Sequence, residues 1–185
     1  ALNHQVKRGE TYTYTVFADN FADDGVYRLT FYSEDEAGNV AENTLDSKNK
    51  ELSFGVDKTA PTLVVVNLES GKTYPVDGMT VNMTANDNLQ LSSITVYLDD
   101  YEKAYQTWSA EEIAQILSEN GEFSFEVDGT SKKAHNVKIV CVDAAGNEYV
   151  EKVTEFYVTT DLLVRYYNNK PLFYGSLTGL LVVVI

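Results

Sequence analysis

The chain has 185 residues, enough for one or two domains, and 44% of them are hydrophobic, including 13 Tyr and 8 Phe, which excludes a disordered chain. Its formal net charge of −14 repels phosphate backbones and excludes nucleic acid as an expected partner. Cys141 is the only cysteine, which excludes an intrachain disulfide and a zinc site built from cysteines. The abundance of Thr, Val and aromatic residues favours strands over helices.

An internal repeat organises the chain. Residues 35–39 (DEAGN) return as residues 143–147 (DAAGN), and strand-like segments flank both blocks in the same order. Residues 9–57 match only the second half of residues 60–160. We therefore predict an all-β chain of tandem immunoglobulin-like β-sandwich modules. Residues 1–57 are a truncated module with about three strands, residues 58–161 are a complete module, and the chain is an excerpt of a longer protein.

The complete module is expected to contain seven strands. Apolar and polar residues alternate over residues 79–85, where Met79, Val81 and Met83 share one face, and again over residues 91–98, where Ile94 and Val96 do so. Short strands separated by turn residues are typical of a sandwich. The other strands are expected at residues 62–68, 102–107, 122–127, 136–142 and 148–158.

One short helix is predicted near residues 110–118. Ser109 and Glu112 have the spacing of a capping box, in which each side chain binds the backbone N–H of the other residue. Asn120 and Gly121 are suited to end the helix. We expect this helix to bridge the two sheets in place of an edge strand.

The chain resembles the bacterial immunoglobulin-like modules of Gram-positive cell-surface proteins. The resemblance rests on the joint at residues 57–61 (DKTAP), on Asp87-Asn88 and on the two Asp-x-Ala-Gly-Asn blocks, and it covers roughly residues 9–160. It implies an extracellular spacer or adhesive stalk without enzymatic activity. Unlike in antibody domains, Cys141 has no disulfide partner, so we expect it to be a small buried apolar residue.

The Asp-x-Ala-Gly-Asn blocks have two interpretations. Asp35 and Asp143 can accept backbone N–H groups across a tight turn that needs no ligand. Alternatively, calcium binds where the joint and two loops meet, because a hard cation needs oxygen ligands from several loops. A loop of the first module with Asp19, Asn20, Asp23 and Asp24 could contribute. The predicted calcium ligands are Asp57, Asp87, Asn88 and Asp143.

The remaining polar residues suggest no chemistry. His4 and His135 lie among polar residues and are expected to be solvated surface histidines. No catalytic motif is found, so we predict that the chain is not an enzyme and needs no cofactor other than the calcium described above. Strand tyrosines either pack across strands or form an aromatic platform for a glycan or protein. These tyrosines are Tyr12, Tyr14, Tyr97, Tyr101 and Tyr105.

The C-terminal tail is apolar and uncharged over residues 172–185. We predict that residues 162–185 are a juxtamembrane segment and the start of a membrane anchor, although a buried strand would have the same composition. Several residues suit the headgroup region of a membrane. They are Arg165, Tyr166, Tyr167, Lys170 and Tyr174.

These features predict a non-catalytic extracellular spacer or stalk on a bacterial cell surface, anchored to the membrane. Its partners would be neighbouring immunoglobulin-like modules of the same chain. Two alternatives remain open. The chain could be an adhesin-type binding module for a host protein or glycan, or an accessory domain of a secreted carbohydrate-active enzyme.

Overall fold

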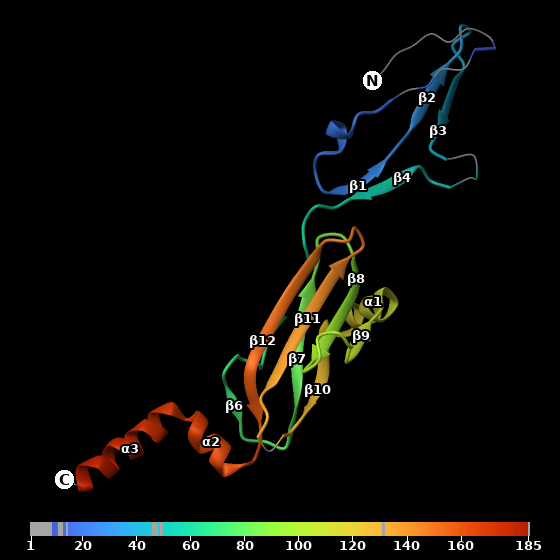
Figure 1. Cartoon of the computed structure of the whole chain (residues 1–185). Helices are drawn as coiled ribbons and strands as arrows, with labels where there is room; N and C mark the ends of the chain where they lie inside the picture. Colours follow the sequence, from blue (N-terminus) through green and yellow to red (C-terminus); the bar gives the residue numbers. More distant parts are fainter. Residues whose placement is uncertain are drawn as a thin grey trace. The chain divides into compact units, whose positions relative to one another are not determined.

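The computed structural model describes residues 9–10, 13, 15–45, 48, 50–130 and 132–184 (Figure 1). The chain divides into two compact units, Ala1–Lys58 and Thr59–Ile185. Both are built mainly from antiparallel strands, as the composition predicts.

The first unit has two separate two-stranded antiparallel sheets and one short 3-10 helix. Strand β1 pairs with β4, and β2 pairs with β3, both antiparallel. Aromatic rings of Phe21, Tyr27 and Phe54 pack together, with centroids 4.9 to 5.7 Å apart. The elements are η1 (Ala18–Phe21), β1 (Gly25–Arg28), β2 (Phe31–Glu34), β3 (Val40–Asn43) and β4 (Ser53–Val56).

The second unit is a two-sheet β-sandwich. One sheet has the order β10-β7-β5 and the other has the order β6-β12-β11-β8-β9, which is the strand order of an immunoglobulin-like sandwich. The strands are β5 (Thr62–Val65), β6 (Thr73–Tyr74), β7 (Gly78–Asn86), β8 (Leu91–Leu98), β9 (Gln106–Trp108), β10 (Glu122–Asp128), β11 (His135–Asp143) and β12 (Glu148–Val158).

The core lies between the two sheets of this sandwich. Val81 and Met83 of β7 and Ile94 and Val96 of β8 are fully buried, which confirms the faces predicted from alternation. Trp108 lies at the edge of the core, and its ring packs edge-on against the ring of Phe123 in β10 of the opposite sheet. Buried apolar side chains of this kind each contribute about 1.5–3 kcal/mol to folding.

The predicted helix is present as α1 (Ala110–Glu119). The Ser109 backbone N–H donates to Glu112 Oε2 at 2.8 Å and the Glu112 N–H donates to Ser109 Oγ at 3.4 Å, so the capping box is formed. The helix contacts β8, β9 and β10 and therefore bridges the two sheets as expected. It does not replace an edge strand, because β9 is also present, shortened to residues 106–108 by a turn in which Asp100 accepts the Glu102 N–H.

Strand β6, a two-residue strand that pairs in parallel with the end of β12, is not predicted from the sequence. The pair is held by hydrogen bonds from Tyr157 N–H to the Lys72 carbonyl and from Thr159 N–H to the Tyr74 carbonyl, both 2.9 Å. Two residues are too few to show a periodic pattern, so only the pairing reveals this strand.

The C-terminal tail forms two helices, α2 (Leu162–Asn168) and α3 (Lys170–Val184). The alternative interpretation of this tail as a strand is therefore wrong. Asp161 caps α2 by accepting the N–H groups of Leu163 and Val164 at 2.8 and 3.2 Å. Among the described residues, no helix has both the length and the apolar character needed to cross a membrane.

Candidate functional site

The loop after β7 and the turn between β11 and β12 meet at one end of the sandwich. The Ala144 N–H donates to the Gln90 carbonyl at 2.9 Å and joins the two segments. A carboxylate oxygen of Asp87 and one of Asp143 lie within 4.8 Å of each other. The expected meeting of these two loops is therefore confirmed, and it brings two of the predicted calcium ligands together.

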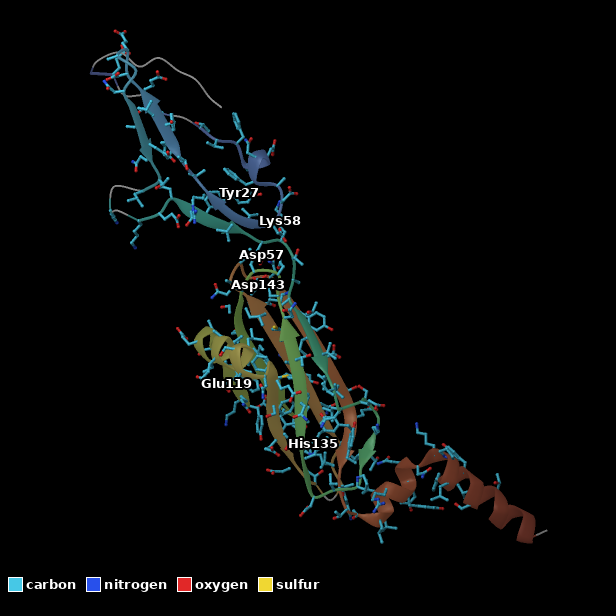
Figure 2. All side chains as sticks on the ribbon, turned by 180° about the vertical axis from the view of Figure 1, so that it is seen from behind. Tyr27, Asp57, Lys58, Glu119, His135 and Asp143 are labelled. Atoms are coloured by element: carbon cyan, nitrogen blue, oxygen red, sulfur yellow. The ribbon has the colours of Figure 1, made fainter. Side chains whose placement is uncertain are left out.

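Asp143 is buried and holds the β11–β12 turn together (Figure 2). Its Oδ1 accepts the backbone N–H groups of Ala145 and Asn147, both at 2.8 Å, and its Oδ2 accepts the Asn147 side-chain amide at 2.7 Å. Gly146 takes a φ of 93°, a conformation that glycine adopts without strain. The turn interpretation of this block is thus confirmed in the second unit.

The first unit repeats this turn bond for bond. Asp35 Oδ1 accepts the N–H groups of Ala37 and Asn39 at 2.9 and 2.8 Å, and Oδ2 accepts the Asn39 amide at 2.7 Å. Gly38 has a φ of 85°. The Asp-x-Ala-Gly-Asn block therefore encodes one turn structure in both units.

Asp87 differs from Asp143 in having an oxygen without a partner. Its Oδ2 accepts the N–H groups of Leu89 and Gln90, both at 2.8 Å. Its Oδ1 is buried and has no hydrogen-bond partner among the described residues. A buried carboxylate oxygen without a donor is costly, and a cation is one group that would satisfy it.

The hydrogen bonds of the β11–β12 turn favour the charged form of Asp143. Burial raises the pKa of Asp143, but the side-chain and backbone hydrogen bonds from Asn147 outweigh it and hold the pKa below its ordinary value. Negative charges on the carboxylates of Asp87 and Asp143, whose oxygens lie within 4.8 Å of each other, would repel by about 1–4 kcal/mol, depending on the local dielectric. Burial, followed by the charges of Asp87 and Asp143, raises the pKa of the nearby Cys141 thiol to about 11.

The other predicted ligands have different positions. Asn88 is exposed in the loop after β7, and Asp57 belongs to the first unit, so their participation stays a prediction. Of the additional loop residues suggested for the first module, Asp24 accepts the Lys58 N–H at 3.0 Å and Asn20 donates to the Phe17 carbonyl at 3.0 Å. These two side chains help to shape their own unit.

The prediction for His135 is wrong, because this histidine is buried inside the sandwich (Figure 2). Strand β11 begins at His135, one residue earlier than expected, and the alternation through Val137 turns the ring inward. Its Nδ1 lies 2.9 Å from Asp99 Oδ2, its ring packs on Phe156, and its Nε2 has no partner among the described residues. His4 lies outside the described residues.

The sequence does not predict Asp99 as the partner of His135. Asp99 has a φ of 62°, and its Oδ1 accepts the Asn136 N–H at 2.9 Å. Asp99 lies 36 positions before His135, and a contact between residues so far apart leaves no local signal in the sequence. The pair holds the start of β11 to the end of β8.

The predicted tyrosine platform is largely engaged in contacts within the sandwich. Lys138 Nζ lies 4.0 Å from the Tyr97 ring centroid and 5.3 Å from that of Tyr101. The Tyr105 hydroxyl donates to the Glu126 carbonyl at 3.0 Å. These contacts favour cross-strand packing. Tyr12 and Tyr14 lie outside the described residues.

Comparisons with known proteins give only distant likenesses. No family model and no curated protein matches the chain. Fibronectin(III)-like modules of Clostridium thermocellum CbhA superpose with a TM-score of 0.41 and 15% identity, covering 76% of this chain and 66% of that one. Murine CRIg gives a TM-score of 0.32 and 9% identity, covering 54% and 98%.

A third solved structure is a Ca2+-stabilized adhesin described as helping an Antarctic bacterium to reach out and bind ice. Its TM-score is 0.33 at 21% identity, and the match covers 77% of this chain and 33% of the adhesin. The chain thus spans just under two thirds of the CbhA modules and a third of the adhesin. The fold of the second unit rests on its own strand order, and a Gram-positive source stays a prediction.

Proposed function

We propose that the chain is a non-catalytic spacer of an extracellular bacterial surface protein. One observation carries this proposal: the chain enters the second unit at one end and leaves it at the other. Thr62 at the start of β5 pairs with Asn86, beside the acidic loops, whereas Val158 at the end of β12 pairs with Tyr74 (Figure 1). The 11 residues of β12 extend the chain by about 36 Å between these ends.

This proposal is tested by measuring the length of the second unit in solution. Ala60→Cys and Thr160→Cys place dyes at the two ends, in a Cys141→Ala background that removes the native thiol. Single-molecule energy transfer should give one narrow distance population. The matched control pairs Ala60→Cys with Gln90→Cys at the same end, where transfer should be nearly complete. A broad distribution for the end-to-end pair would contradict a rigid spacer.

We propose calcium binding at the acidic end of the second unit as a second function. The support is the unpartnered Asp87 Oδ1 beside the charged Asp143. A cation would remove the repulsion between the two carboxylates and satisfy the buried oxygen, and carboxylates are preferred calcium ligands. Asn88, in the loop after β7, is a further proposed ligand, and Asp57 of the first unit stays a sequence-based prediction. Such an ion would stiffen the loops rather than take part in chemistry.

Urea unfolding with and without calcium tests this site, with fluorescence of the single tryptophan, Trp108, as the readout for the second unit. Free calcium at about a hundred times its Kd should add about 2.7 kcal/mol to the free energy of unfolding. Asp87→Asn should abolish this gain, whereas Asp100→Asn, which removes an exposed carboxylate of the same unit, should retain it. Loss of the gain in Asp57→Asn would add Asp57 to the ligands.

Identical unfolding curves in calcium and in chelator would contradict calcium binding and leave the acidic loops as turn structures only. The spacer proposal would stand, because it depends on the placement of the chain ends.

We also propose that the C-terminal helices attach the protein to a membrane by lying against it. Large apolar side chains of α2 and α3 are exposed, with Leu163 64% and Leu172 55% accessible. Rings of Tyr166, Tyr167 and Phe173 pack on one another at the junction of the helices, and aromatic clusters are favoured at the membrane interface.

Co-sedimentation with phosphatidylcholine vesicles tests this attachment. The Leu163→Ser/Leu172→Ser variant should bind the vesicles more weakly. The control is Val64→Ser/Val66→Ser, which removes two valines that are 59% and 64% exposed on the sandwich. Equal binding by both variants would argue against a contact through the helices.

A further inference from the structure

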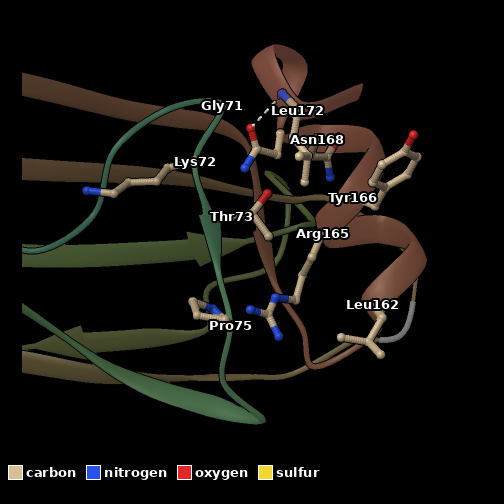
Figure 3. A pocket seen from close by; sticks show the side chains of 10 residues that line it. Gly71, Lys72, Thr73, Pro75, Leu162, Arg165, Tyr166, Asn168 and Leu172 are labelled. Carbon is tan, nitrogen blue, oxygen red and sulfur yellow. Dashed lines mark hydrogen bonds between the residues drawn. The ribbon is translucent and has the colours of Figure 1, made fainter. Parts of the chain in front are cut away.

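A pocket of about 560 Å3 lies in the second unit, between the segment around β6 and the helices α2 and α3 (Figure 3). Thr73 and Pro75 line it from the β6 side. Arg165 and Asn168 line it from α2, and Leu172 lines it from α3. The pocket is on the far side of the sandwich from the acidic loops, near the end from which β12 leaves.

The charge of this pocket is opposite to that of the chain. The net charge of the chain is −14, yet the lining contains Arg165 and Lys72 and no acidic side chain. Lys72 is held by Glu69 at 2.7 Å, and Figure 3 shows its side chain directed away from Arg165. Arg165 extends from α2 toward Pro75, and no carboxylate of the described residues lies within ion-pair distance of it.

A second donor in the pocket lacks a partner. The Thr73 hydroxyl is buried and has no hydrogen-bond partner among the described residues. A guanidinium and a hydroxyl lining the same cavity are suited to an anion with several acceptor oxygens, and the planar fork of arginine matches phosphate.

The rim of the pocket is apolar and open to solvent. Leu162 is 74% exposed and Leu172 is 55% exposed, and both line the cavity. A free anion gains nothing from such a rim, whereas a lipid headgroup presents a phosphate beside its acyl chains. We propose that this pocket binds the phosphate of an anionic phospholipid headgroup, an inference that rests on the proposed membrane attachment of the helices.

Vesicles of two compositions test the pocket: phosphatidylcholine alone, and phosphatidylcholine with phosphatidylglycerol. The wild-type chain should bind the mixed vesicles more tightly. Arg165→Gln should reduce this preference by about fivefold, the effect of one basic residue at an anionic surface. Lys170→Gln removes the same charge from the first residue of α3, outside the pocket, and should reduce the preference less. Thr73→Val should weaken it while keeping the side-chain volume.

The outcomes separate the two proposals. Equal binding of the wild type to both vesicles, or equal losses in Arg165→Gln and Lys170→Gln, would overturn the headgroup pocket and leave the membrane attachment intact. Absence of binding to either vesicle would overturn both proposals. Binding of inorganic phosphate that depends on Arg165, without any preference for the mixed vesicles, would assign the pocket to a soluble anion and overturn the lipid as its occupant.

Discussion

Asp35 and Asp143 occupy the same position in two copies of one turn, but Asp143 is buried and Asp35 is exposed. The hydrogen bonds that each carboxylate accepts agree in donor position and differ in length by 0.1 Å or less. The two turns therefore separate the effect of burial from the effect of hydrogen bonding.

Asp143→Asn should destabilise the second unit by about 2–3 kcal/mol. The substitution weakens the charge-assisted bonds from Ala145 and Asn147 and places one amide group against another. Urea unfolding followed by Trp108 fluorescence measures the change, since this buried side chain is the only tryptophan. Asp35→Asn is the matched control and should leave the Trp108 transition unchanged. Equal shifts of the Trp108 unfolding transition in the two variants would contradict a stabilising role of the Asp143 carboxylate in the second unit.

The stability of the second unit should fall in acid through Asp143. Its pKa is lower in the folded state, so the unfolded state binds more protons and stability rises with pH. The contribution is fully present above the ordinary carboxyl pKa of about 4 and is lost as the pH falls through the lower folded value. Urea midpoints measured from pH 6 to pH 2 should show a shallower loss in Asp143→Asn than in the wild type. Parallel plots of urea midpoint against pH for the wild type and Asp143→Asn would exclude Asp143 as the source of the acid-dependent loss of stability.

Cys141 should be unreactive toward thiol reagents in the folded protein. The side chain is completely buried, and its pKa of about 11 leaves almost no thiolate at neutral pH. Labelling with a chromogenic disulfide should be slow in buffer and fast in urea. Because Cys141 is the only thiol, Cys141→Ala gives the baseline. Rapid labelling of the native chain would show that the core opens readily.

Asp99→Ala should cost about 2–4 kcal/mol in the second unit. The substitution removes the acceptor for the buried His135 and for the Asn136 N–H, and it places alanine at a φ of 62°. Asp100→Ala removes the neighbouring carboxylate, which accepts only the Glu102 N–H among the described contacts, and should cost much less. Trp108 unfolding curves for both variants provide the comparison, and similar losses would contradict a structural His135–Asp99 pair.

Local patterns account for the parts of the fold that the sequence predicted well. The alternation over residues 91–98 coincides with β8, and Ser109 with Glu112 placed the start of α1 correctly. The predicted pairing of Asp87 with Asp143 followed from the order of strands in this type of sandwich.

Features that depend on distant contacts could not be predicted in this way. Burial of His135 depends on Asp99 and Phe156, which come from other strands or loops. The unpartnered oxygen of Asp87 is a property of its packing, because any aspartate in that turn would look the same in the sequence. The tail was ambiguous because an apolar run has no period that separates a strand from a helix.

The parallel pairing of β6 with β12 has a mechanical consequence. Tension applied between the start of β5 and the end of β12 reaches β6 through β5, which precedes it in the chain. It pulls β6 and β12 in opposite directions along their own axes. The backbone hydrogen bonds donated by Gly71, Tyr157 and Thr159 join the β6 segment to β12. They are therefore loaded together in shear and must break nearly simultaneously. Antiparallel strands pulled apart from a hairpin end would instead unzip one bond at a time. We therefore expect the pairing of the two-residue β6 with β12 to resist extension of the second unit under force.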